Sequence, residues 1–244
     1  MTTNTVVVIP TYNEVENLPR IVQEILNLEI EDLGILVVDD GSPDGTGEVA
    51  DKLAEEHPGV ISVMHRTTKD GLGRAYRAGM GKAVADGADL VVQMDADFSH
   101  PPTALRDMIE AARNGAGVVI GSRYTSGGSL DEAWAAHRRL LSKWANFYVK
   151  TILSVPAADV TAGYNLWSKE ALAAVGLERI ESNGYSFQVE MKYLAAKAGV
   201  RIVEVPIRFG QRASGESKMS INTQLESAWM PWRLRAKHRG SEKG

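Results

Sequence analysis

The chain has 244 residues, of which 44% are hydrophobic, and this suits one large α/β domain or two small ones while excluding a disordered or fibrous protein. It has no cysteine, which excludes a disulfide framework and a thiolate metal site; any bound metal must use oxygen or imidazole ligands, which favours Mg²⁺ or Mn²⁺ over zinc. The formal net charge of −4 argues against a general nucleic-acid binder, so no nucleic-acid partner is expected.

The start of the chain does not resemble a targeting segment. Residues 1–5 carry no basic cluster and no apolar core, and no stretch approaches the roughly 18 apolar residues that a membrane-spanning helix requires. We therefore expect a cytoplasmic protein. Positive charge is concentrated near the end of the chain, where residues 233–243 hold five Lys or Arg and a single Glu.

Short β-branched runs alternate with amphipathic segments along the first half of the chain. The runs, which have the pattern of strands buried on both faces, are 6–9, 35–38, 90–94 and 117–120. The segments with one apolar stripe at helical spacing are 15–28, 45–56 and 103–113. The alternation predicts βαβ units in a parallel sheet that binds ligands at the carboxyl ends of its strands. Longer amphipathic segments follow, then a Val-rich strand at 200–205 and a basic tail.

The first polar cluster follows the first expected strand. It contains Pro10, Tyr12, Asn13 and Glu14, at the edge of the sheet where ligand-binding loops gather. The same residues also suit a strand end followed by a helix cap at Asn13, with Glu14 and Glu16 favouring the helix N-terminus. This cluster alone leaves both interpretations open.

The second cluster, Val38-Asp39-Asp40-Gly41-Ser42-Pro43-Asp44-Gly45, follows the second expected strand. Two adjacent carboxylates at a strand end can bind ribose hydroxyls or a base N–H. Asp-Gly and Pro-Asp-Gly are also ordinary turn sequences, so a purely structural role is open here as well.

The third cluster is more specific. Asp95 and Asp97 lie two residues apart at the end of a buried strand, so both can face one side and bind a hard divalent cation together with a nucleotide diphosphate. A pair of solvated loop carboxylates is the alternative. His100-Pro101-Pro102 then ends the strand and starts a helix.

In this order, the clusters resemble those of family 2 glycosyltransferases with the GT-A fold, and the nearer match is to dolichyl-phosphate (polyprenol-phosphate) mannose synthases. The resemblance extends from Val6 to about Met219. Its motifs are IPTYNE (9–14), VVDDGSPDGT (37–46), GLGRAY (71–76), MDADFSHPP (94–102), GSRY (121–124), GYSFQVEM (184–191), VPIRF (205–209) and GESKM (215–219). The pair DADFSHPP and GESKM is specific to the branch that acts on lipid phosphates.

This resemblance implies a GT-A (Rossmann-like) α/β fold: a mostly parallel central sheet with helices on both faces, in a domain of residues 1–218. An amphipathic, basic C-terminal segment, 219–244, follows it. The implied reaction is inverting transfer of mannose from GDP-mannose to a polyprenyl (dolichyl-type) monophosphate, with Mg²⁺ or Mn²⁺ as cofactor. Within the same branch, transfer of glucose from UDP-glucose is the alternative, and those relatives more often carry transmembrane helices.

The resemblance also assigns roles to individual residues. Guanine and ribose would be held by Pro10, Tyr12, Glu14, Val38 and Asp40. The metal and diphosphate would be held by Asp95, Ala96 and Asp97, with Ser99 as a further metal ligand. Phosphates would be met by Arg123, Arg212 and Lys218, with Arg138 and Ser142 on the acceptor side.

The chemistry of the implied acceptor explains why cations are expected at these positions. A phosphate monoester has a second pKa of about 6 and arrives ionised, so the enzyme needs cations more than a general base. Arg123, Arg212 and Lys218 can hold its oxygen in line with the anomeric carbon, while the metal and arginines stabilise the leaving diphosphate. Without the resemblance, an ordinary solvated surface is the other interpretation of these residues.

Two stretches have the pattern of a membrane-surface helix. Apolar residues recur at helical spacing in both, at Leu140, Leu141, Trp144, Phe147, Tyr148 and Ile152, and at Ile221, Leu225, Trp229 and Trp232. Trp beside Arg suits the lipid headgroup zone. For the first stretch, burial against the sheet is an equal alternative, and in the second we expect Pro231 to kink or end the helix. We expect peripheral attachment at the cytoplasmic face of a membrane, directly or through a separate membrane-anchoring subunit.

Other function classes fit the sequence less well. A dinucleotide-dependent oxidoreductase needs G-x-G-x-x-G after the first strand, whereas GLGRAY lacks the third Gly and comes later. A sugar-nucleotide pyrophosphorylase needs a Gly-rich basic loop where this chain has IPTYNE, and a processive polysaccharide synthase usually carries Q-x-x-R-W and membrane spans. A non-catalytic binding module would require loss of the acidic pair, which is intact.

Overall fold

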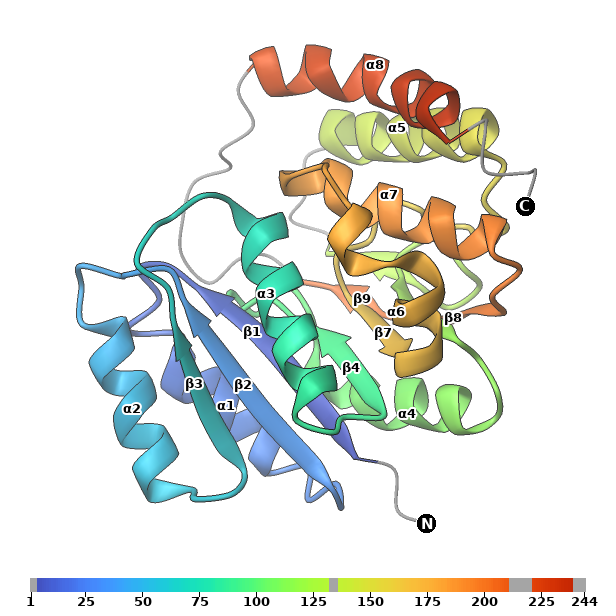
Figure 1. Ribbon diagram of the computed structural model, residues 1–244. Coiled ribbons are helices and arrows are strands. Elements are labelled where there is room, and N and C mark those ends of the chain that lie inside the picture. Colours follow the sequence, from blue (N-terminus) through green and yellow to red (C-terminus); the bar gives the residue numbers. More distant parts are fainter. Residues whose placement is uncertain (1–3, 132–135, 211–220, 239–244) are drawn as a thin grey trace.

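The computed structural model describes residues 4–131, 136–210 and 221–238, and the fold centres on a seven-stranded sheet (Figure 1). In sheet order the strands are β3 (Ile61–His65), β2 (Leu33–Asp39), β1 (Thr5–Thr11), β4 (Leu90–Gln93), β7 (Asn165–Ser168), β5 (Val118–Ser122) and β8 (Ile202–Pro206). Only β7 runs antiparallel to its neighbours; the other paired strands of this sheet are parallel. The expected mostly parallel α/β fold is confirmed.

Two strands of this sheet are not predicted by the sequence patterns. Strand β3 lies at the sheet edge and is only partly buried, so its sequence ISVMH lacks the continuous apolar run of a central strand. Strand β7 has four residues, NLWS, with Asn165 and Trp167 buried beside Leu166. A run this short and polar carries no periodic signal. The sheet therefore has more strands than the four-stranded parallel sheet that the first half of the sequence predicts.

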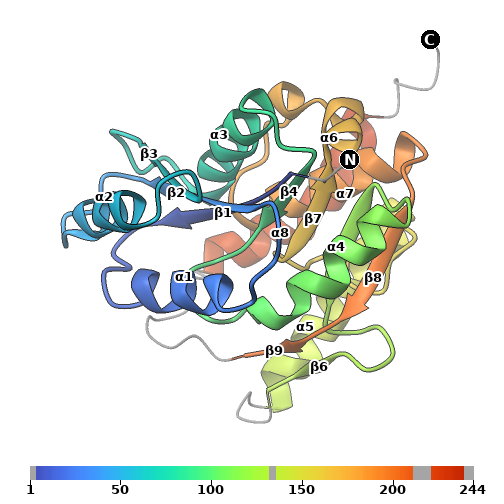
Figure 2. The same ribbon diagram turned by 90° about the horizontal axis from the view of Figure 1, so that it is seen from below.

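Helices cover both faces of the sheet, as Figure 2 shows by turning the molecule on its side. One apolar core joins the sheet to α1 (Leu18–Leu26), α2 (Thr46–Glu56) and α4 (Leu105–Arg113), the last preceded by the turn η1 (Pro102–Ala104). The core on the opposite face involves α3 (Leu72–Ala85), α5 (Ala136–Leu153), α6 (Lys169–Val175) and α7 (Gly184–Lys197). Each apolar stripe predicted for α1, α2 and α4 thus faces the sheet.

Helix α1 begins later than expected. It starts at Leu18 after Asn17, whose side-chain amide donates to Glu14 Oε2 at 2.8 Å. Asn13 does not cap it: the residue has φ +61°, and its backbone N–H donates to Ser42 Oγ. The interpretation of Asn13 as a helix cap is therefore wrong.

The C-terminal helix α8 (Ile221–Lys237) packs beside α5, and both lie on the outer side of α7 (Figure 1). It continues through Pro231, which is buried, so the expected end of the helix at this proline is wrong. Proline removes one backbone donor and disfavours a helix interior. Side-chain contacts offset that cost: Leu234 is buried in the core, and Arg235 donates to the Ile152 carbonyl at 2.8 Å.

Helix α5 exposes much of its apolar side. Val149, Ile152 and Leu153 are buried, whereas four large side chains face outward: Leu140, Leu141, Trp144 and Phe147. One of the two interpretations of this segment was that its apolar stripe is buried against the sheet. That interpretation is wrong for the four exposed side chains. Among the described residues, no helix combines the length and apolar character needed to traverse a bilayer.

A two-stranded parallel ladder of β6 (Ser129–Leu130) and β9 (Arg208–Phe209) completes the fold beyond the ends of β5 and β8. It joins the segment that follows β5 to the one that follows β8. The hydrogen bond from Ser129 N to Ile207 O, at 2.9 Å, extends the same contact. The loop after Arg123 is thereby held against the strand that precedes the GESKM segment.

Candidate active site

The first three polar clusters meet at one edge of the sheet. Thr11, at the end of β1, lies beside Asp39 at the end of β2, and Asp40 N donates to Thr11 O at 3.1 Å. On the other side of β1, Met94 N donates to Val8 O at 3.2 Å as the chain leaves β4. The three strands are parallel neighbours, so their carboxyl ends form a common rim, where open α/β sheets bind ligands.

The second cluster holds the backbone of the first. Glu14 N donates to Thr46 Oγ1 at 3.0 Å, and Val15 N donates to Asp44 Oδ2 at 3.3 Å. Asp44 also accepts from Thr46, and these hydrogen bonds outweigh burial to keep the pKa of Asp44 below its usual value. The turn residues after β2 thus fix the position of Tyr12 and its neighbours.

The adjacent carboxylates Asp39 and Asp40 have different environments. Asp39 accepts hydrogen bonds from Thr11 Oγ1, Ser42 N and Ser42 Oγ, so its oxygens stabilise the loop. Asp40 is buried and pairs with Arg66 Nη1 at 2.6 Å. Burial raises the pKa of Asp40 although Arg66 opposes the shift. Of the two carboxylates, Asp40 is the one paired with a side chain from the loop after β3, and its role toward a ligand stays a prediction.

Two cationic side chains lie at this rim that the sequence did not predict as site residues. Arg66 follows β3 and pairs with both Asp40 and Asp70. Lys69 places its Nζ 3.4 Å from the centre of the Tyr12 ring. Both belong to the loop after β3, the strand that the sequence pattern does not reveal. The signal that could have located them is the run His65-Arg66-Thr67-Thr68-Lys69-Asp70 after a short β-branched segment.

The acidic pair after β4 is held by a compact turn. Asp95 Oδ1 accepts from the Tyr76 hydroxyl at 2.6 Å, and Asp97 Oδ1 accepts from Ser99 N at 3.0 Å. Between Asp97 and Ser99, Phe98 adopts φ +63°, a left-handed backbone conformation that suits a tight turn. His100 accepts from Asp95 N through Nδ1 at 3.0 Å and stacks on Tyr164, with 5.0 Å between ring centres. The turn is therefore anchored from the core by Tyr76 and Tyr164.

The donor set fits a hard divalent cation. Among the residues that the structure describes, no group of three or more His, Cys, Asp or Glu side chains forms a complete metal cage. Mg²⁺ commonly binds to one or two carboxylates and takes its other ligands from phosphates and water. Asp95 and Asp97 provide two such carboxylates at the rim. Ser99 is buried beside them, and its role as a ligand stays a prediction.

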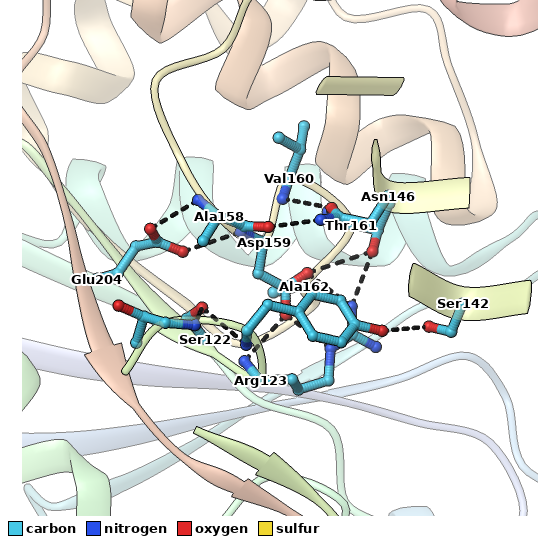
Figure 3. Close-up of polar contacts among 12 residues, drawn as sticks. Ser122, Arg123, Ser142, Asn146, Ala158, Asp159, Val160, Thr161, Ala162 and Glu204 are labelled. Atoms are coloured by element: carbon cyan, nitrogen blue, oxygen red, sulfur yellow. Dashed lines mark hydrogen bonds and ion pairs between the residues drawn. The ribbon is translucent and has the colours of Figure 1, made fainter. Parts of the chain in front are cut away.

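Arg123, which leaves β5, is engaged by a buried carboxylate (Figure 3). Its Nε and Nη2 donate to the two oxygens of Asp159 at 2.7 Å each, its backbone N–H donates to Oδ2 at 3.0 Å, and Nη2 also donates to Thr161 Oγ1 at 2.8 Å. Burial would raise the pKa of Asp159, but hydrogen bonds and charge from Arg123 outweigh it and lower that pKa. The predicted phosphate-binding arginine is thus rigidly oriented.

The loop that carries Asp159 is clamped from three further elements. Asn146 Oδ1 on α5 accepts from Val160 N at 2.8 Å, and Glu204 on β8 accepts from Asp159 N at 2.9 Å (Figure 3). Lys192 on α7 is fully buried and donates to Ala162 O at 2.6 Å. Burial lowers the pKa of Lys192 to about 7, although Asp159 opposes the shift.

A cavity of about 580 Å³ opens beside this network, lined by Arg123, Tyr124, Gly128, Ser129, Leu130, Arg139, Lys143 and Asn146. Three of these side chains are cationic, so the cavity suits an anion. Ser142 lies at its edge, where its hydroxyl is 2.7 Å from the Tyr124 hydroxyl. Arg139 and Lys143 are not among the predicted site residues; their spacing of four on one helix is the signal that could have identified them.

The structure describes most of the predicted site residues, and their roles stay predictions. Pro10, Tyr12, Glu14, Val38 and Asp40 gather at the rim of β1 and β2, and Asp95, Ala96 and Asp97 lie at the neighbouring end of β4. Arg123 comes from β5, separated from β4 by β7. Arg212 and Lys218 lie outside the described residues, and so does the side chain of Arg138.

Curated proteins with similar sequences cover nearly the whole chain. A polyprenol monophosphomannose synthase of Mycolicibacterium smegmatis is 44% identical over 238 residues, which are 97% of this chain and 89% of that protein. An undecaprenyl-phosphate mannosyltransferase of Micrococcus luteus is 47% identical over 213 residues, which are 87% of this chain and 86% of that protein.

Solved structures share the fold at low sequence identity. A glucosyl-3-phosphoglycerate synthase from Mycobacterium tuberculosis, in complex with uridine diphosphate, has a TM-score of 0.63 and 18% identity, and the match covers 96% of this chain and 80% of that one. A mannosyltransferase from Pyrobaculum calidifontis, in complex with GDP-Man and Mn²⁺, has a TM-score of 0.57 and 15% identity, covering 100% and 77%. These matches confirm the glycosyltransferase type of α/β fold.

The family model described as glycosyl transferase family 2 matches residues 6–176, from the start of β1 to the end of α6. That span includes the rim of β1, β2 and β4, the acidic pair and Arg123. Together with the identity to the curated relatives, the match shows that this chain is an enzyme of glycosyltransferase family 2.

Proposed function

We propose that the chain transfers mannose from GDP-mannose to a polyprenyl monophosphate, giving polyprenyl-phosphate-mannose and GDP. The observation that carries the proposal is a pair of carboxylates, Asp95 and Asp97, on the same sheet edge as a cavity lined by Arg123, Arg139 and Lys143. The names of two relatives at 44% and 47% identity, a polyprenol monophosphomannose synthase and an undecaprenyl-phosphate mannosyltransferase, agree with it.

The donor would bind along the rim of β1, β2 and β4. Guanine and ribose would lie against Pro10, Tyr12, Glu14, Val38 and Asp40, and the diphosphate would reach Ala96 between the two aspartates. Asp40 would accept from the base or ribose, in place of part of its contact with Arg66. Support for a GDP-sugar comes from the Pyrobaculum calidifontis mannosyltransferase, which shares the fold and whose structure contains GDP-Man.

A divalent cation would be held by Asp95 and Asp97, with Ser99 as a further ligand. It would supply charge that neutralises the leaving diphosphate. Oxygen ligands suit both Mg²⁺ and Mn²⁺, and solved structures of the same fold contain one or the other with a nucleotide.

The acceptor phosphate would enter the cationic cavity. Its oxygen is ionised near neutral pH, so the chain needs to orient it and screen its charge rather than remove a proton. Arg123 is fixed by Asp159 for this task, while Arg139, Lys143 and Ser142 provide further donors from α5. Arg138, Arg212 and Lys218 are proposed to complete the phosphate contacts. In-line attack on the anomeric carbon would invert its configuration in one displacement.

The lipid would approach along α5 and α8, so we propose peripheral attachment at the cytoplasmic face of a membrane. Six of the large exposed apolar side chains are on these two helices: Leu140, Leu141, Trp144, Phe147, Trp229 and Trp232. Trp144 stacks on Tyr148, and Trp232 Nε1 donates to the Tyr148 hydroxyl at 3.0 Å, so the helices form one surface. A contiguous apolar patch beside an anion-binding cavity suits a lipid phosphate. A membrane-anchoring subunit could add to this attachment.

The test is a transfer assay with purified protein. GDP-mannose and UDP-glucose, each radiolabelled in the sugar, are incubated separately with polyprenyl phosphate in vesicles, and the lipid phase is extracted and counted. The proposal expects label in lipid only from GDP-mannose, with loss on EDTA treatment and recovery with Mg²⁺ or Mn²⁺. Transfer from UDP-glucose alone would replace the donor assignment, and no transfer to lipid from either donor would reject the acceptor.

A further inference from the structure

The GLGRAY motif at 71–76 opens α3 and has no part in the function proposed above. Its glycines allow close packing: a Cβ on Gly73 would lie 3.0 Å from atoms of Asn183 and Phe187 on the neighbouring α7 segment. One turn and a half further on, a Cβ on Gly79 would lie 2.6 Å from Val8 and less than 3 Å from Val38. Helix α3 therefore packs tightly onto β1 and β2, directly beneath the rim that carries the candidate site.

This packing buries Tyr76 completely and brings its hydroxyl to the acidic pair. The hydroxyl donates to Asp95 Oδ1 at 2.6 Å, and the ring lies parallel to that of Phe187, with 6.4 Å between their centres. Tyr76 therefore connects the hydrophobic core to a carboxylate that we assign to the cation.

Asp95 is held at a second point by its backbone. Its N–H donates to His100 Nδ1 at 3.0 Å, which fixes the main chain where the strand ends. Within the described part of the chain, its other carboxylate oxygen, Oδ2, has no hydrogen-bond partner and is not enclosed by the core. One oxygen of Asp95 is thus fixed from below, and the other is left for a ligand.

We propose that Tyr76 is a positioning residue for the cation. Its hydroxyl sets the rotation of the Asp95 carboxylate, so that Oδ2 is presented to a Mg²⁺ or Mn²⁺ ion shared with Asp97. Partners that hydrogen-bond to a metal ligand orient it and contribute to metal affinity. The inference deepens the proposed function, because it rests on Asp95 and Asp97 as the metal ligands.

A tyrosine that only fills the core and finds an acceptor for its hydroxyl would pack in the same way. The two roles differ in what happens to metal binding when the hydroxyl alone is removed. Tyr76→Phe keeps the ring against Phe187 and deletes one oxygen. Tyr164→Phe is the matched control: Tyr164 is also fully buried beside the site, but its hydroxyl donates to the Pro101 carbonyl, at 3.2 Å, rather than to a carboxylate.

The experiment measures Mn²⁺ binding by electron paramagnetic resonance, which needs no turnover. Full-length wild type, Tyr76→Phe and Tyr164→Phe are titrated with Mn²⁺ alone, with GDP and with UDP, and GDP affinity is measured separately in EDTA. We expect Tyr76→Phe to bind Mn²⁺ about 10-fold more weakly than wild type, with GDP affinity in EDTA unchanged, and Tyr164→Phe to bind Mn²⁺ like wild type.

Equal Mn²⁺ affinities in wild type and Tyr76→Phe, or equal losses in both variants, would overturn the role of Tyr76 and leave the proposed function intact. Failure of the wild type to bind Mn²⁺ with either nucleotide would reject the metal site itself. If Tyr76→Phe unfolds at a lower temperature than Tyr164→Phe, 3-fluorotyrosine is placed at position 76 by amber suppression. This residue keeps the ring and the hydroxyl, so Mn²⁺ affinity should stay near wild type. A loss as large as in Tyr76→Phe would show that Mn²⁺ binding does not depend on this hydroxyl and would overturn the proposal.

Discussion

Arg123 and Asp159 form a two-pronged ion pair in which both carboxylate oxygens accept from the guanidinium at 2.7 Å. The aspartate is fully buried and the arginine nearly so, yet Arg123 also lines the cationic cavity. A guanidinium held in this way cannot turn to follow a ligand, so its orientation in the cavity is fixed. Such preorganisation is what a phosphate-orienting residue needs.

Asp159→Asn tests whether this pair serves acceptor binding. The amide keeps the shape but loses the charge, which removes the ionic partner of the Arg123 guanidinium and weakens the contacts that orient it. We expect the KM for polyprenyl phosphate to rise about 10-fold, GDP affinity to stay near wild type, and the free energy of unfolding to fall by about 3 kcal/mol. Steady-state kinetics, GDP titration and urea unfolding measure the three quantities.

Asp89→Asn is the control for the Asp159 variant, because it removes the charge of a partly exposed aspartate from its ion pair with Lys169, at the opposite end of β4 from the rim. It should leave both stability and the acceptor KM near wild type. A large loss of stability in Asp159→Asn with an unchanged acceptor KM would show that the Arg123–Asp159 pair only supports the fold.

The acidic pair is tested by Asp95→Ala and Asp97→Ala. Each removes a carboxylate from the proposed metal and diphosphate site, so we expect Asp97→Ala to abolish transfer and Asp95→Ala to reduce it severely. The matched control is Asp86→Ala, which breaks an exposed pair with Lys82 on α3. More than about a tenth of the wild-type rate in Asp97→Ala at saturating metal would contradict the assigned role.

The sequence allows prediction of the fold type and of the rim where ligands bind, because buried parallel strands and their terminal polar clusters leave local signals. Strands β1, β2, β4, β5 and β8 all overlap the predicted ranges. Strands β3 and β7 leave no such signal, since one is a half-exposed edge and the other has four residues. The cations Arg66 and Lys69 are missed for the same reason.

Other parts of the site depend on contacts between distant segments and could not be read from local patterns. Arg123 is 36 residues from Asp159, and Tyr76 is 19 residues from Asp95. Lys192 is 30 residues from the Ala162 carbonyl that it contacts. Nothing in the sequence around these residues shows that they meet. The packing of α3 and α7 on the sheet brings Tyr76 and Lys192 to their acceptors, and the loop before β7 brings Asp159 to Arg123.

Lys192 gives a pH dependence whose sign can be worked out. Its pKa is about 7 in the folded chain, against about 10.4 for an unperturbed lysine. Between these values the unfolded chain binds a proton that the folded chain has released, so this residue makes stability rise with pH in that window. Below pH 7 both states are protonated and its contribution is constant. The gain is at most about 1.4 kcal/mol per pH unit.

Lys192→Met isolates this effect, since methionine has a similar length and does not titrate. The free energy of unfolding is measured in urea for both proteins from pH 6 to pH 9. We expect the difference, wild type minus variant, to grow in favour of the wild type above pH 7. A constant difference would mean that Lys192, with Asp159, Arg123 and Glu204 around it, stays protonated through this range.

The exposed apolar side chains of α5 and α8 give the last prediction, which concerns the membrane. Trp144 is 59% exposed and Phe147 66%, while Trp229 is 75% and Trp232 51% exposed. Deleting α8 would also remove Leu234 from the core and the ion pair between Lys237 and Glu190, so truncation after Ser220 would perturb the fold as well as the surface. Point substitutions separate the two effects.

Trp144→Ser combined with Phe147→Ser should reduce sedimentation with anionic vesicles and raise the apparent KM for long-chain polyprenyl phosphate. A short, water-soluble prenyl phosphate should be used nearly as well as by the wild type, because the cationic cavity is unchanged.

Trp229→Ser combined with Trp232→Ser tests vesicle binding by α8 in the same way. On this helix Lys237 already pairs with Glu181 and Glu190, and Arg235 donates to a carbonyl of α5. Because those cations are engaged within the protein, we expect the two substitutions on α5 to reduce vesicle binding more than the two on α8.

Leu72→Ser, at an exposed apolar residue at the start of α3, is the control and should bind vesicles like wild type. If both double variants sediment like wild type, the surface of α5 and α8 does not contact lipid, and attachment would have to come from another partner.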